Sequence, residues 1–367
     1  GQALSFIVIA VGLGLYWDNI WPLVIATAAS WGVSLVHRIV DVRHYMRFVV
    51  PLSEIRDGFR ALPSMLVFGL KTAPGMVSDG VASESGTFIL GITNSVAGVG
   101  AWSRARQLGY RLQESATRIN EVYFPTLCER RANGDEEGHD RALMDTLRYS
   151  SIAFLLAAAA GGGAAHGVMN LFGPGFDQAS DAFALILLAQ ALAIAIGVLA
   201  LAMWAADRPL QDSYVAVGRA VLLIGLSIPL AMQMGVTGPA LASVVANAAG
   251  IVVLLPLVRS RAMFGSMRTY WPLRQVVFLA MSYVGGFLAA RLVDDLLPGL
   301  VGLVLALPTG AGVFVAILML TGGLNERERA RLAGALSKGR GLSGDDDAPP
   351  DHDPTTAADR PAGVVEE

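Results

Sequence analysis

Three charged residues, Lys71, Asp79 and Glu84, lie within an apolar segment, Leu62–Ile92. On insertion scales, a charged side chain at the centre of a bilayer costs about 2.5–3.5 kcal/mol. Such residues are retained where they line a cavity enclosed by protein or pair with one another. The segment therefore predicts a polar pathway through a membrane. Asp79 and Glu84 are candidates to bind a coupling cation, Na⁺ or H⁺, and we expect no other cofactor.

Lys71 and Asp79 are not a direct pair. In a helix, a separation of eight residues places them about 80° apart around the axis and about 12 Å apart along it. Lys71 therefore meets either a carboxylate elsewhere in the protein or an anionic substrate. Glu84 has its own alternative, because it lies close enough to the end of the segment to be solvated.

The composition is that of a membrane protein. Hydrophobic residues make up 54% of the 367 residues and charged residues only 16%, whereas a soluble domain carries about 25% charged residues. A single cysteine, Cys128, excludes an internal disulfide and a cysteine-based metal cluster. The chain opens with Gly1 inside an apolar run, without an initiator Met or a signal-peptide pattern, so we expect its natural N-terminus to lie further upstream.

Ten apolar runs have lengths that suit a membrane-spanning helix. We therefore predict an all-α polytopic membrane protein with about ten transmembrane helices. The predicted spans are Gln2–Trp17, Ile20–Val36, Leu62–Ile92, Val96–Val122, Tyr149–Phe172, Phe183–Ala205, Ser213–Gln233, Pro239–Val258, Val276–Leu292 and Gly299–Thr321.

Basic residues gather in alternate loops between these spans, such as 38–60 and 259–274, and the other loops contain almost none. By the positive-inside rule, the odd-numbered spans run outward and the C-terminus is cytoplasmic. This topology places Lys71 nearer the cytoplasmic half of its helix, Asp79 near mid-depth and Glu84 towards the outside.

Three further segments have a distinct composition. Arg111–Arg148 carries charges at helical spacing and is predicted to be helical and partly interfacial. The tail after Leu342, with its acidic run Asp345–Asp347, cannot bury a core and is predicted to be disordered. The small residues of Ala157–Ala165 predict a face where helices approach closely.

Motifs of ATP-driven transport and of membrane enzymes are not found in the sequence. There is no G-x-x-x-x-G-K-[ST] motif and no H-E-x-x-H; Gly339–Gly344 is only superficially similar to the former, since it follows no predicted strand. The longest predicted outer loop, Gly173–Ala182, is too short to build the site of a glycosyltransferase or a polymerase. We therefore expect a transporter and not an enzyme, without a nucleic-acid partner.

Three stretches together resemble a known family. They read FILGITNSVAGVGAWSRARQL (Phe88–Leu108), YFPTLCERRANG (Tyr123–Gly134) and LFGPGFDQASDA (Leu171–Ala182). Their order and spacing resemble Wzx-type polysaccharide flippases of the MOP (multidrug/oligosaccharidyl-lipid/polysaccharide) superfamily. The later stretch GVTGPALA (Gly235–Ala242) is similar to the turn before that family's twelfth helix, so the resemblance covers roughly residues 62–258.

The resemblance implies twelve to fourteen helices in two six-helix lobes, of which this chain would hold helices five to fourteen. The implied parts are the last two helices of the first lobe (1–37), a cytoplasmic basic loop (38–61), the second lobe (62–258), a cytoplasmic loop (259–275), two C-terminal helices (276–321) and a mostly disordered cytoplasmic tail (322–367).

The resemblance also implies a function, the movement of undecaprenyl-pyrophosphate-linked oligosaccharide across the bacterial cytoplasmic membrane by alternating access. This step serves surface polysaccharide or lipopolysaccharide biosynthesis, with membrane lipids and, as further partners, a polysaccharide polymerase and glycosyltransferases. The diphosphate needs cations and the sugar needs a wet cavity with aromatic walls. The candidates are Lys71, Arg104 and Arg219 for the anion, and Trp102 and Tyr110 for the sugar.

Each assignment has an alternative. Arg106 and Arg219 could extend to the cytoplasmic interface, and Trp102 and Tyr110 could serve in packing or in an interfacial aromatic belt. The alternative functions are a lipid II flippase or a cation-coupled multidrug exporter of the same superfamily. More distant ones are a membrane glycosyltransferase, a polysaccharide polymerase and a scaffolding protein.

Overall fold

The computed structural model of this chain describes residues 21–49, 52–261, 273–297 and 299–323. Every regular element within these ranges is helical, and none of the described residues forms a strand, so the predicted all-α class is confirmed. Six helices are long and apolar enough to cross a membrane, and they correspond to the fifth to tenth predicted spans. The helices over the second to fourth predicted spans are not among these six, and the first predicted span, Gln2–Trp17, lies outside the described residues.

The chain divides into two compact units, Gly1–Pro74 and Gly75–Glu367. In the first unit, α2 (Trp21–Val49) is followed by the beginning of α3 (Leu52–Thr93). The basic segment predicted as a loop over 38–61 is therefore mostly helical. Between His37 and Val49 the sequence contains no glycine or proline, and its arginines are good helix formers, so the charges do not stop the helix.

The second unit contains the end of α3 and all later helices. These are α4 (Val96–Ala132), α5 (Glu136–Gly163), α6 (Ala165–Asn170), a 3₁₀ turn at Asp177–Ala179, α7 (Ser180–Ala205), α8 (Pro209–Met234), α9 (Thr237–Arg261), α10 (Leu273–Leu296) and α11 (Leu300–Leu320). Helices α4 and α5 cover most of Arg111–Arg148, which confirms that this segment is helical.

The fifth predicted span, Tyr149–Phe172, is not one continuous helix. The structure begins it earlier, as α5 at Glu136, and interrupts it at Ala164 before the short helix α6. The side chain of Asp135 caps the start of α5 by accepting from the Gly138 N–H at 2.9 Å. The glycine run that ends α5 favours the interruption, because glycine is a poor helix former.

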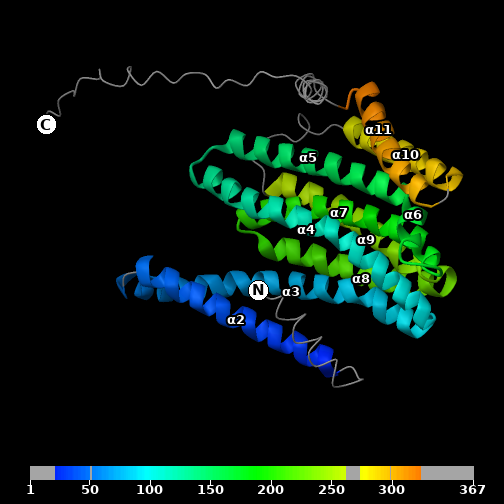
Figure 1. Cartoon of the computed structure of the whole chain (residues 1–367). Helices are drawn as coiled ribbons and strands as arrows, with labels where there is room; N and C mark the ends of the chain where they lie inside the picture. The colour runs from blue at the N-terminus through cyan, green and yellow to red at the C-terminus, as the bar shows by residue number, and fades with distance from the viewer. Residues whose placement is uncertain (1–20, 50–51, 262–272, 298, 324–367) are drawn as a thin grey trace, which may run out of the picture. The chain divides into compact units, whose positions relative to one another are not determined.

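Helix α7 is the central helix of the second unit. It contacts α4, α5, α8 and α9, and Figure 1 shows these helices running side by side. Its apolar residues are spread over all of its faces, and most of them are buried. A helix that is hydrophobic all round belongs in the interior, so the sequence of α7 matches its place.

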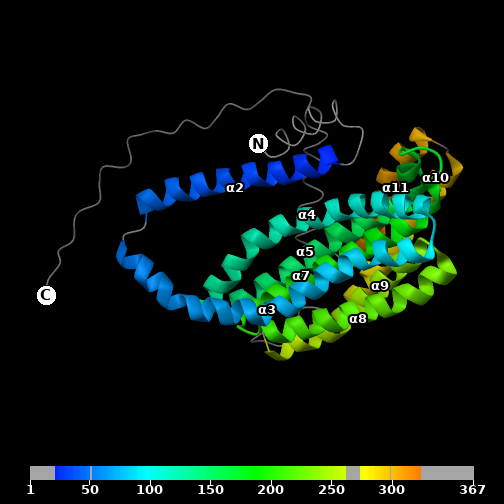
Figure 2. The same ribbon diagram turned by 90° about the horizontal axis from the view of Figure 1, so that it is seen from below.

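Helices α10 and α11 form a pair that packs against α5 (Figure 2). Small residues allow this approach: a methyl group at Gly163 would overlap the Ala290 side chain and the Phe287 carbonyl, and one at Gly286 would lie 2.8 Å from the Gly310 carbonyl oxygen. The close helix approach predicted for Ala157–Ala165 is thus confirmed.

Candidate functional site

Two ion pairs in the second unit join α3 to two different helices. Asp79 accepts a hydrogen bond from Arg219 of α8, and Glu84 pairs with Arg106 of α4 at 2.7 Å. The two carboxylates are five residues apart in α3, which corresponds to about 140° around the helix axis. Each therefore faces its own neighbour.

The Arg106 guanidinium has several partners. Its Nη2 donates to Glu84 Oε1 at 2.7 Å, and its Nη1 donates to the Ser83 carbonyl at 2.6 Å and to Thr87 Oγ1 at 3.4 Å. It also lies over the Tyr110 ring, 5.3 Å from the ring centroid, within the range of a cation–π contact. Arg106 therefore fixes α4 to one face of α3.

The Arg219 guanidinium has fewer partners. Besides Asp79, it donates to Asn247 Oδ1 of α9 at 3.5 Å. Asn247 is itself buried, and its Nδ2 donates to the Ala189 carbonyl of α7 at 2.8 Å. The site therefore combines groups from α3, α7, α8 and α9 around one arginine.

Burial differs between the two members of each pair. The side chains of Arg219 and Arg106 are 14% and 19% exposed, whereas those of Asp79 and Glu84 are 51% and 54% exposed. A guanidinium in apolar surroundings needs a partner, and each carboxylate supplies one while keeping an open side. The acidic members can therefore meet solvent or a ligand without a change of fold.

Another carboxylate lies near the Asp79–Arg219 pair. The charges of both residues act on Asp212, which lies on α8. Asp212 Oδ2 accepts from Trp204 Nε1 at 2.9 Å, so the residue is tied to the end of α7. Within the described ranges, no group of three or more His, Cys, Asp or Glu side chains could hold a metal ion.

The other two predicted anion contacts are not members of these pairs. Lys71 is on α3, half-buried, in the first unit. Arg104 is exposed on α4, where its Nη1 donates to Gln107 Oε1 at 3.1 Å. The structure thus pairs Arg219, a predicted anion contact, with Asp79, a predicted cation site. It does not bring Arg104 to either pair.

The two aromatic candidates have different surroundings. Trp102 is only 4% exposed and belongs to the hydrophobic core, where a methyl group on Gly86 would lie 2.7 Å from its ring. Tyr110 is half-buried beneath Arg106. The structure therefore places Trp102 in the packing between α3 and α4, and Tyr110 within the Arg106 cluster.

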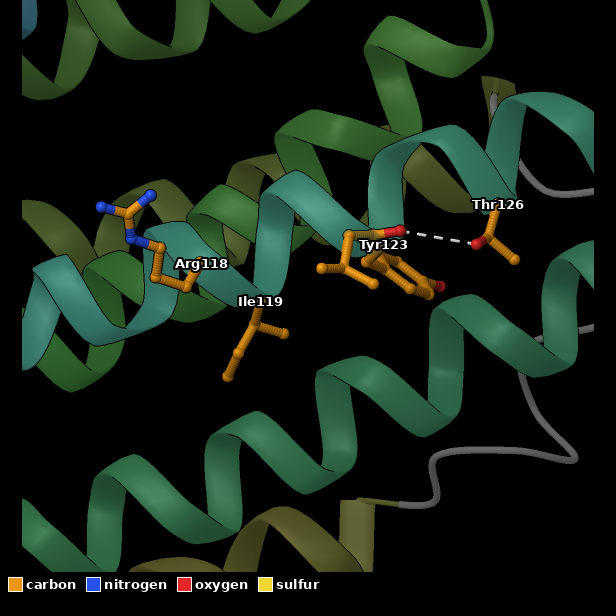
Figure 3. A pocket seen from close by; sticks show the side chains of 5 residues that line it. Arg118, Ile119, Tyr123 and Thr126 are labelled. Carbon is orange, nitrogen blue, oxygen red and sulfur yellow. Dashed lines mark hydrogen bonds between the residues drawn. The ribbon is translucent and has the colours of Figure 1, made fainter.

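A hollow of about 470 Å³ lies along α4 (Figure 3). Its lining residues are Arg118, Ile119, Val122, Tyr123 and Thr126. The dashed line in the figure is the bond from Thr126 Oγ1 to the Val122 carbonyl, 3.5 Å long. The wall is mainly apolar and comes from a single helix, and none of the seven predicted site residues contributes to it.

Sequence reasoning did not assign Arg106 to Glu84, although the sequence contains a signal for this pair. Glu84 lies nine residues before the end of α3 and Arg106 ten residues after the start of α4, which is about 14 and about 15 Å from the turn. Two residues equally far from the turn of a helical hairpin lie side by side. Asn247 and Asp212 were also missed, and no local pattern links them to Arg219.

Comparison with known protein families matches residues 1–160 to a family described as polysaccharide biosynthesis protein. The matched range includes Asp79 and Glu84 of α3 and the stretches Phe88–Leu108 and Tyr123–Gly134, and it ends before Leu171–Ala182. A search of curated proteins found no match. The family match supports a role in polysaccharide biosynthesis for this multi-pass membrane protein. Residues 1–160 are thus similar to a polysaccharide biosynthesis protein family, which agrees with the resemblance to polysaccharide flippases at the level of polysaccharide biosynthesis.

Proposed function

We propose that this protein is a flippase that moves an undecaprenyl-pyrophosphate-linked oligosaccharide from the cytoplasmic to the outer leaflet of the bacterial cytoplasmic membrane. The observation that carries the proposal is Arg219, a mostly buried arginine that is held by the half-exposed carboxylate of Asp79. Guanidinium groups in an apolar surrounding suit the recognition of phosphate. The match to a polysaccharide biosynthesis family supports the same substrate class.

In this proposal the protein is a transporter, alternates between inward-open and outward-open states, and keeps its C-terminus in the cytoplasm. Lys71, Arg104 and Arg219 provide charge for the pyrophosphate, and the half-buried Tyr110 serves the sugar. Asp79 and Glu84 are the candidates to couple transport to Na⁺ or H⁺. The glycosyltransferases and the polymerase that act before and after translocation are the proposed partners.

The test is transport in proteoliposomes that contain the protein and a fluorescent lipid-linked oligosaccharide. Movement to the opposite leaflet is measured by loss of protection from a membrane-impermeant quencher. We expect Lys71→Ala, Arg104→Ala and Arg219→Ala to reduce the rate, because each removes a cation from the pyrophosphate path. Normal transport in all three variants would contradict the assignment of these cations, and no transport by the unmodified protein would contradict the flippase itself.

A second candidate is a cation-coupled multidrug exporter of the same superfamily, because Asp79 and Glu84 are half-exposed and could receive a cationic drug. A lipid II flippase is the third, since it requires the same pyrophosphate contacts. The same vesicles distinguish them: an exporter moves a fluorescent organic cation, and a lipid II flippase prefers labelled lipid II to the oligosaccharide-linked lipid.

A further inference from the structure

The Arg219 guanidinium is positioned by core helices that do not include α3. Asn247, fixed to the Ala189 carbonyl by its Nδ2, presents its Oδ1 to Arg219 Nη1. Gly250 leaves space for the aliphatic stem, since a methyl group there would lie 3.3 Å from Arg219 Cδ. Helices α7, α8 and α9 therefore position the guanidinium group of Arg219.

Asp79 is the only member of this arrangement that comes from α3. Its side chain is 51% exposed, in contrast to 14% for Arg219. A guanidinium recognises a carboxylate and a phosphate with the same planar set of N–H donors. The Asp79 carboxylate thus occupies a position that a phosphate oxygen could occupy, and it can leave towards its open side.

Arg106 differs from Arg219 in its bonding, and this difference makes the replacement of a carboxylate by a phosphate specific to Arg219. Its N–H groups already reach Glu84, the Ser83 carbonyl and Thr87, so an incoming anion would have to displace several bonds at once. Arg219 instead donates to one carboxylate, that of Asp79, and forms one long bond to Asn247. Asp212, the other carboxylate whose charge acts on this site, is engaged by Trp204.

We propose that Arg219 is an anion-binding residue for the phosphate of the lipid carrier, and that Asp79 is an internal anion that occupies it when no substrate is present. Asn247 acts as a positioning residue through its bond to Arg219. The proposal rests on the proposed function for the identity of the ligand. Its consequence is that arrival of a phosphate releases α3 from α8 at this point, which links substrate binding to a change in helix contacts.

The test measures binding of farnesyl pyrophosphate, a pyrophosphate on a short prenyl chain, to the whole protein in detergent by isothermal titration calorimetry. Farnesol is the control ligand without phosphate. Asp79→Asn removes the competing charge, and we expect tighter binding by about threefold. Arg219→Gln removes the guanidinium, and we expect binding at least about tenfold weaker. Glu114→Gln is the matched control, because it neutralises an exposed carboxylate that pairs with Arg111 of its own helix, and we expect it to leave the affinity within about twofold.

The Asp79→Asn result keeps the test informative if Arg219→Gln fails to fold, because misfolding does not produce a gain of affinity. Unchanged or weaker binding by Asp79→Asn, or an equal gain in Glu114→Gln, would overturn the exchange. The outcome is separate from that of the transport assay. Failed oligosaccharide transport with the expected binding pattern contradicts the flippase, whereas normal transport without that pattern contradicts only the role of Arg219 and Asp79.

Discussion

The two ion pairs of α3 connect the same helix to two neighbours, but their arginines are satisfied to different degrees. Arg106 bonds to three groups of α3 and lies over Tyr110, whereas Arg219 bonds to one carboxylate and, more weakly, to Asn247. A charge inside an apolar helix bundle can therefore serve in two ways. One arrangement fixes two helices together, and the other holds a cation ready for a different partner.

The pairs also differ in how much of the chain must fold before they form. Glu84 and Arg106 are 22 residues apart, within one helical hairpin, and Asp79 and Arg219 are 140 residues apart. The first pair can form as soon as α3 and α4 meet. The second requires α8 to be in place, so it reports on the assembled unit and not on a local element.

The largest effect on stability is expected from Arg106→Ala. This change leaves Glu84 without its guanidinium partner and the Ser83 carbonyl without a donor, and the loss of such bonds to a charged group is expected to cost about 2 kcal/mol. The measurement is the free energy of unfolding in mixed micelles. Arg104→Ala is the control, because that side chain is exposed and bonds only within its own helix; an equal loss in both variants would contradict the role of Arg106 as a clamp.

Double-mutant cycles on the two pairs should give the next largest difference. We expect a coupling energy of about 1–2 kcal/mol between Glu84→Gln and Arg106→Gln, since the pair is part of a bonded cluster. For Asp79→Asn and Arg219→Gln we expect less than about 1 kcal/mol, as is usual for a pair with one well-exposed member. Equal coupling in both cycles would remove the distinction between the two pairs.

Two glycine substitutions should disturb the pairs separately, with the smallest effects. A methyl group at Gly86 would lie 2.7 Å from the buried Trp102 ring, and one at Gly75 would lie 3.1 Å from Ser213. We expect Gly86→Ala to cost about 1 kcal/mol by overpacking. For Gly75→Ala, the gain in helix propensity offsets most of the crowding, so the change in unfolding free energy should be below about 0.5 kcal/mol. Thermal unfolding of both variants checks this order. A larger loss of stability in Gly75→Ala than in Gly86→Ala would contradict it.

Hydropathy was sufficient to predict much of this fold. Each of the fifth to tenth predicted spans overlaps a helix that can cross a membrane, because about twenty apolar residues in a row leave few other structures. The density of basic residues predicted a loop over residues 38–61, but α2 and α3 cover most of this range. Charge density indicates where a chain leaves lipid, but it does not indicate where a helix ends.

The sequence was sufficient to select the candidate residues, but it did not show which of them pair with one another. Lys71, Asp79, Glu84 and Arg219 were selected because each is a charge in an apolar run, which is a property of one helix. Which face of α3 meets which helix depends on packing among distant segments, and a single sequence does not reveal this for Asp79 and Arg219. The burial of Trp102 against Gly86 has the same origin, since it depends on how α3 and α4 approach.

The all-round apolar surface of α7 also bears on how the protein is made. Of the six helices that can cross a membrane, α7 has the highest hydropathy, so the insertion machinery can release it into lipid readily. Its neighbours α8 and α9 follow it in the chain, and their synthesis ends only at Arg261. During this interval lipid tails cover the faces that protein later covers. An apolar helix tolerates that exchange, whereas a polar one in the same place would need a chaperone.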